Sequence, residues 1–209
     1  MVHPWIKTFF KVGRELAVKR LAALPSAQPI GWDGTIQDHL TPEEWKSFDQ
    51  EITEQLKEKN DRSLAIASAS MVEERLRWLI ETKFIDGLSQ TKKDRIFTGL
   101  GPLSSFTAKI EVAYALGLLK PEMREQLQII SKIRNKFAHN FRRIRFTDQE
   151  IASLCETLRK FDKEGYQRRA ELRELYGFSC IICGLALLVT GQLVLASRPG
   201  LSLSPKKSE

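Results

Sequence analysis

An arginine and a histidine, five residues apart, form the pair in this sequence with the clearest chemical potential. They are Arg134 and His139, in the segment RNKFAH. Histidine ionises near neutral pH and can act as a general base toward a hydroxyl group. Arginine offers a planar fork of hydrogen-bond donors that stabilises negative charge on a phosphate. Together these two side chains could cleave RNA through its own 2′-hydroxyl group, without a metal ion.

The spacing decides whether the two side chains can act together. Residues five apart on an α-helix are separated by about 140°, so Arg134 meets His139 only if it reaches around the helix or the helix ends there. Asn135 lies four residues before His139, on the same face, in a supporting position. The structural alternative is that His139 complements the dipole at a helix C-terminus and that Arg134 pairs with a nearby acidic residue.

Basic residues surround this pair, and three phenylalanines are interleaved with them. No acidic residue occurs between Glu125 and Asp148. Basic side chains with exposed aromatic rings suit single-stranded RNA, so RNA is one predicted partner. The same run would suit an anionic membrane surface, or a solvated rim with the phenylalanines buried. The candidate nucleic-acid or phosphate-binding positions are Lys132, Lys136, Arg142, Arg143 and Arg145, and the phenylalanines are Phe137, Phe141 and Phe146.

The RxxxxH pattern of Arg134 and His139 resembles the motif of the HEPN superfamily. Many of its members are metal-independent ribonucleases, whereas others only bind or dimerise. In that superfamily two motifs face each other across a dimer of helical bundles. The resemblance therefore implies a homodimer in which both residues are catalytic.

Helical patterns must position these residues, and they dominate the chain from residue 41 onward. Apolar residues recur at helical spacing, and no stretch alternates in the manner of a β-strand. The predicted fold class is therefore all-α, with a helical bundle over residues 41–174. Helix starts are indicated at Asn60 or Asp61, at Ser104 or Ser105, at Pro121, and at a capping box in residues 147–150.

The C-terminal part of the chain contains an uncharged apolar stretch, residues 175–197. As a helix, its central 19 residues would be about 28 Å long, close to the ~30 Å hydrocarbon core of a bilayer. Its polar residues do not gather on one face, as they would on a core helix. The sequence therefore predicts one transmembrane helix, followed by a short polar tail at 198–209.

Basic residues are more numerous before this stretch than after it, so the positive-inside rule places the N-terminal domain in the cytoplasm. The predicted location is the bacterial inner membrane, with a single span. Cys180, Gly184 and Gly191 share one face of the span, which predicts self-association through small residues. Truncation before Gly177 is expected to release a soluble domain.

Residues 1–40 predict a basic amphipathic helix followed by a linker rich in proline and glycine. This helix packs on its own domain or lies on the anionic membrane surface, and an organellar transit peptide is a third alternative. Asp33, Asp38 and His39 of the linker lack a second cluster at ligand spacing, so no metal site is predicted.

The overall composition narrows the classes of function. The formal net charge of +7 and the sequence pI of about 9.4 favour anionic partners. Three cysteines do not make a disulfide scaffold. The chain contains no P-loop, dinucleotide-binding fingerprint, catalytic triad or zinc-ligand spacing, so we expect no cofactor.

Several motifs occur in an order that resembles the mannitol operon repressor family. They are GLGPLSSF at 99–106, YALGL at 114–118, RNKFAH at 134–139 and FTDQEI at 146–151. The resemblance covers residues 61–161 and implies a helical regulatory domain without a recognised helix-turn-helix. We therefore expect a membrane-anchored regulatory module that binds a protein partner or a second copy of itself. Its tether disfavours sequence-specific DNA binding, and RNA cleavage by Arg134 and His139 is the rival function.

Overall fold

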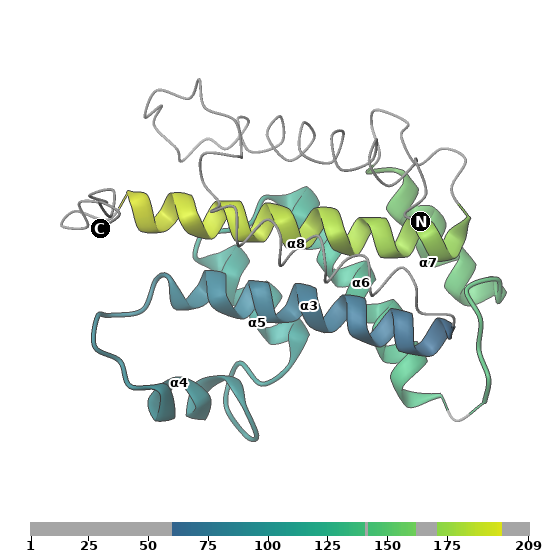
Figure 1. The fold of residues 1–209 in the computed structure, drawn as a ribbon. Helices are drawn as coiled ribbons and strands as arrows, with labels where there is room; N and C mark the ends of the chain where they lie inside the picture. The colour runs from purple at the N-terminus through teal and green to yellow at the C-terminus, as the bar shows by residue number, and fades with distance from the viewer. Residues whose placement is uncertain (1–59, 141, 162–170, 198–209) are drawn as a thin grey trace, which may run out of the picture.

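The computed structural model describes residues 60–140, 142–161 and 171–197 (Figure 1). Within these residues every regular element is an α-helix and none is a strand, which confirms the predicted all-α class. The predicted N-terminal helix, its linker and the polar tail lie outside them. The helices are α3 (Asp61–Glu81), α4 (Gln90–Phe97), α5 (Phe106–Ala115), α6 (Pro121–His139), α7 (Gln149–Arg159) and α8 (Leu172–Ala196).

Local capping signals start three of these helices where the sequence predicts. The Oδ1 atom of Asn60 accepts a hydrogen bond from the backbone N–H of Arg62 at 2.9 Å, at the start of α3. The Oγ atom of Ser105 accepts from the N–H of Ala108 at 3.1 Å, at the start of α5. Pro121 is the first residue of α6, a position where its missing N–H has no helical partner to lose.

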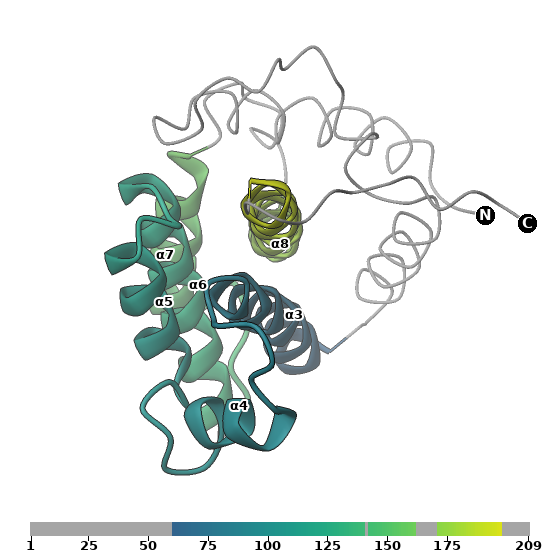
Figure 2. The same cartoon turned by 90° about the vertical axis from the view of Figure 1, so that its left-hand side faces the viewer.

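Helices α3 and α8 run side by side and in the same direction along the length of the molecule (Figure 1). In the end-on view, α5, α6 and α7 lie together on one side of this pair (Figure 2). Near the start of the pair, the hydroxyl of Tyr176 donates a buried hydrogen bond to the carbonyl of Ala65 at 2.9 Å. Near its end, Gly191 lies against the ring of Trp78. The seam between α3 and α8 is therefore a main part of the core.

The helix that we predicted to span a membrane is a core helix in this structure. Among the described residues, α8 alone is long and apolar enough to cross a bilayer, yet 67% of its most apolar stretch is buried inside the protein. Two of its polar side chains are satisfied within the helix: the hydroxyls of Ser179 and Thr190 donate to backbone carbonyls one turn earlier. A helix that is covered on several sides needs no polar face. The lack of a polar face therefore did not distinguish a core helix from a membrane span here. The predicted inner-membrane location thereby loses its basis.

The small residues of α8 make room for α3. A Cβ atom added to Gly191 would lie 2.0 Å from Cζ3 of Trp78. A Cβ atom added to Gly184 would lie 3.1 Å from Cε of Met71 and 3.2 Å from Cδ of Arg75. Close approach through small residues, which we predicted between two copies of this helix, is thus used for packing within one chain.

The three cysteines are free and buried. Burial raises the pKa of the Cys155 thiol to about 12 and holds that of Cys180 well above its usual value. Both groups therefore stay protonated at neutral pH, where the thiolate is the reactive form. The three side chains act as small apolar residues of the core.

Candidate functional site

Helix α6 carries both members of the predicted catalytic pair. Ile133 and Phe137 of α6 are fully buried and fix the rotation of the helix about its axis. As a result, Arg134 is half-buried and His139 is exposed. The helix ends at His139, because Asn140 has an extended backbone with φ −93° and ψ 117°.

A cleft of about 640 Å³ opens beside the C-terminal end of α6. It is bordered by the last turn of α6, the residues that follow it, and the first turn of α7. His139 and Asn135 line it together, as their spacing of four residues predicts. The lining residues are Asn135, Lys136, His139, Asn140, Arg142, Ile144, Asp148, Glu150 and Ile151.

Arg134 does not line this cleft. Its Nη1 atom donates to Oδ1 of Asn135 at 2.9 Å, and its Nε atom is buried without a hydrogen-bond partner among the described residues. Its charge also acts on the buried Tyr176: burial raises the pKa of the tyrosine hydroxyl, and Arg134 opposes that rise. Arg134 is therefore connected to the cleft through Asn135, and the structure does not place it beside His139 on one surface.

The predicted basic positions are divided between the cleft and the surrounding surface. Lys136 and Arg142 line the cleft. Lys136 forms an ion pair with Glu150 of α7, so its charge is partly neutralised. The remaining predicted positions are exposed and do not line the cleft; they are Lys132, Arg143 and Arg145.

Two of the three interleaved phenylalanines belong to the core. Phe137 is fully buried and Phe146 is 2% exposed. The centroids of their rings lie 4.9 Å apart, and the ring of Phe146 lies 5.3 Å from that of Tyr176. At these two positions the rings are buried, as in the alternative of a solvated basic rim, and are not exposed for stacking on RNA. Phe141 lies outside the described residues.

The start of α3 holds the chain that borders the cleft. The guanidinium of Arg62 donates to the backbone carbonyls of Asn140 and Arg142, the second at 3.0 Å. The carboxylate of Asp61 accepts the backbone N–H of Phe146 at 3.3 Å. Sequence reasoning considered Asp61 only as a helix cap. From 78 to 85 residues separate these partners, and no local pattern joins them.

The start of α7 forms the opposite wall, and there the predicted capping box does not form. The residue that precedes the helix is Asp148, whose side chain makes no capping hydrogen bond. Its carboxylate instead accepts the backbone N–H of Arg145 at 3.0 Å. Glu150, predicted to reach back to the helix start, pairs with Lys136 of α6. These acidic side chains therefore shape the cleft wall rather than cap the helix.

The cleft offers an exposed imidazole, an arginine and two carboxamides as polar groups for binding. No group of three or more His, Cys, Asp or Glu side chains that could hold a metal ion occurs in the described part of the chain. The linker residues Asp33, Asp38 and His39 lie outside that part. The arrangement is thus a cleft lined mainly by polar side chains, with His139 on its wall.

A family model described as MtlR, mannitol repressor, matches residues 48–176. This chain belongs to the mannitol repressor family. The match extends the resemblance seen at 61–161 on both sides and contains every residue that lines the cleft. It ends early in α8, so most of that core helix lies beyond the matched residues.

A comparison with solved structures finds a chain of the structure described as the MtlR–HPr complex from Escherichia coli. The two chains are 17% identical with a TM-score of 0.46, and the match covers 69% of this chain and 97% of the other. A comparison with curated proteins gives no match. The resemblance of Arg134 and His139 to the HEPN motif stays a prediction.

Proposed function

We propose that this chain is a transcription-regulating protein that acts by binding another protein. The observation that carries the proposal is its membership of the mannitol repressor family over residues 48–176. The described helices support it, because they form one buried core beside an open polar cleft. Regulation through protein contact needs a stable surface.

Protein binding is favoured over sequence-specific DNA binding by the cleft itself. The argument from a membrane tether no longer applies, since α8 is a core helix. Of the two basic cleft residues, Lys136 is engaged by Glu150, and the carboxylate of Asp148 lies in the same lining. With two basic and two acidic side chains, the lining offers no excess of positive charge that would hold a DNA backbone along its length.

The proposal is tested by presenting the full chain with a protein and with DNA under identical conditions. HPr from the same bacterium is the protein probe, chosen because the E. coli structure contains it, and in-cell cross-linking supplies others. The expected result is saturable binding of a protein at a fixed stoichiometry, with DNA binding that is independent of sequence and abolished by salt. Sequence-specific binding of a promoter fragment by the isolated chain would contradict the proposal.

Metal-independent RNA cleavage by a homodimer, as in a toxin or a phage-defence effector, is the second candidate function. The observation in its favour is that His139 and Asn135 line one cleft and that Asn135 holds Arg134 by a hydrogen bond. Cleavage would require His139 as the base and the guanidinium of Arg134 as the group that stabilises the phosphate. Neither role needs a metal ion.

If the chain cleaves RNA, His139→Ala and Arg134→Ala should each lower cleavage about 100-fold or more, with helicity unchanged. Neutralising Arg142, Arg143 and Arg145 should instead flatten the dependence of RNA affinity on salt. The measurement is cleavage of a labelled RNA in the presence of a chelator. Lys83→Ala, an exposed basic position outside the cleft and outside the basic run, is the matched control. A wild-type chain that dimerises but never cuts RNA would eliminate this candidate.

A further inference from the structure

A leucine stands entirely in solvent in the turn that follows α4. Leu100 is 106% exposed, the largest value among the exposed large hydrophobic residues described. Single exposed leucines are common on protein surfaces and need no explanation by themselves. Leu100 differs from such a residue in how rigidly the chain holds it outward.

The backbone of this turn requires glycine on both sides of Leu100. Gly99 has a φ of +59°, in the left-handed region that glycine adopts without strain. A Cβ atom on Gly101 would lie 2.4 Å from the carbonyl oxygen of Arg95, so a larger residue would push the turn away from α4. The N–H of Gly101 also donates to the carbonyl of Thr98 at 2.9 Å. A turn fixed in this way loses little conformational entropy when a partner covers its leucine.

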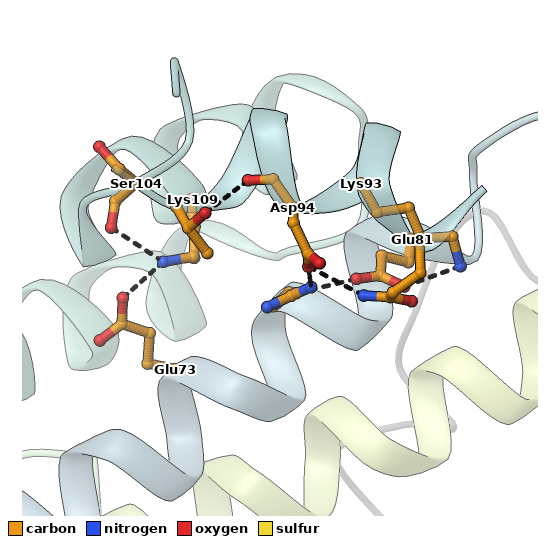
Figure 3. A network of polar contacts seen from close by, with 9 residues as sticks. Glu73, Glu81, Lys93, Asp94, Ser104 and Lys109 are labelled. Atoms are coloured by element: carbon orange, nitrogen blue, oxygen red, sulfur yellow. Dashed lines mark hydrogen bonds and ion pairs between the residues drawn. The ribbon is translucent and has the colours of Figure 1, made fainter. Parts of the chain in front are cut away.

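An ion-pair network fixes α4 itself against α3. Arg77 of α3 donates to Glu81 and to Asp94 of α4, at 2.9 Å each. Lys93 of α4 donates to Glu81 at 3.0 Å, and Figure 3 shows Glu81, Lys93 and Asp94 in this network. The guanidinium of Arg77 also lies 5.0 Å from the ring centroid of Phe97. Helix α4 and the turn after it therefore form a rigid edge of the bundle.

The charges that this network leaves unpaired on α4 are positive. Lys92 and Arg95 are exposed, and neither forms an ion pair with a described residue, whereas Asp94 is engaged by Arg77. The backbone carbonyl of Arg95 lies close to the turn at Gly101, the residue that follows Leu100. Lys92 is three residues earlier, on the same face of α4. Leu100 is thus an exposed apolar residue in the turn that lies next to the basic end of α4.

We propose that Lys92, Arg95 and Leu100 form a docking surface for a partner protein that presents an apolar pocket bordered by carboxylates. The proposal rests on the proposed function and names the place where the protein binds. The positive charges of Lys92 and Arg95 would be complemented by carboxylates on the partner. The fixed, exposed side chain of Leu100 would be buried in an apolar pocket of the partner. A membrane is disfavoured because Phe97 is 3% exposed, which leaves α4 without an apolar face to enter a bilayer.

The test begins with a photo-crosslinking amino acid in place of Leu100 in the full chain, expressed in the native bacterium. The matched control carries it in place of Leu116, which is 47% exposed at the end of α5. The protein crosslinked at position 100 is then purified and titrated against the wild type and three variants. Leu100→Ser should weaken binding about 10- to 30-fold, which corresponds to the loss of one buried leucine. Arg95→Glu should also weaken it, most strongly at low salt, and Leu116→Ser should leave it unchanged.

The outcomes separate this proposal from the proposed function. Equal binding by the wild type and Leu100→Ser would overturn the docking surface and leave protein binding intact. A wild-type chain that binds no protein would overturn both. Binding to vesicles of phosphatidylglycerol and phosphatidylethanolamine is measured for the wild type and for Leu100→Ser. If the wild type binds the vesicles and Leu100→Ser does not, this surface contacts a membrane and the proposal is overturned. Thermal melting of each variant checks that its fold is preserved.

Discussion

Deletion of residues 177–209 should leave a chain that no longer unfolds cooperatively. The deletion removes α8 from Gly177 onward, including core residues such as Cys180, Cys183 and Leu187. Each large apolar side chain buried in a core contributes about 1.5–3 kcal/mol, and a whole domain is stable by only about 5–15 kcal/mol. The stabilising free energy that is lost with most of α8 is therefore larger than the free energy of unfolding of the whole domain. The measurement is thermal melting by circular dichroism, together with size-exclusion chromatography.

The matched control is deletion of residues 198–209 alone, which leaves α8 intact and should preserve the melting transition. The sequence taken alone leads to the opposite expectation, a well-behaved soluble domain after truncation before Gly177. A truncated chain that is monomeric and melts cooperatively would show that α8 is dispensable. It would also restore the interpretation of this helix as an anchor.

Gly191→Leu should lower the stability of the bundle by about 3 kcal/mol, and its melting temperature by roughly 10 °C. Even a Cβ atom at this position would lie 2.0 Å from the ring of Trp78, so the ring must leave its place or α3 and α8 must separate. Gly184→Ala is the control, since its Cβ would meet only the flexible ends of Met71 and Arg75 at 3.1 Å and beyond. Thermal melts of the two variants beside the wild type measure the difference. Equal melting temperatures for wild type and Gly191→Leu would mean that these helices are not in contact.

Features of the fold that depend on neighbouring residues could be predicted from the sequence. Asn60, Ser105 and Pro121 predict where α3, α5 and α6 begin. They can do so because the interactions that start a helix involve residues only a few positions apart. The role of α8 could not be predicted in this way. A core helix and a membrane span share the same length and apolar composition, and only the packing against α3, about a hundred residues earlier, distinguishes them.

In the candidate site too, features set by neighbouring residues could be predicted from the sequence, and features set by distant contacts could not. The shared face of Asn135 and His139 follows from helical geometry alone, and the cleft confirms it. The inward position of Phe137 depends on the rotation of α6 against the core, and that of Phe146 on the course of the chain between α6 and α7. The basic residues around them indicate neither. The link between Lys136 and Glu150 joins two helices, so it replaced a local capping box that the sequence indicated.

The most direct test of α8 as a core helix is fractionation of cells that express the full chain. Membranes are collected without detergent and washed with alkaline carbonate, which removes proteins held by charge but retains those held by a buried apolar span. With α8 packed against α3, the chain should appear in the supernatant and elute as a single species in detergent-free buffer. A chain that remains in the carbonate-washed membranes and requires detergent for release would contradict the core assignment of α8.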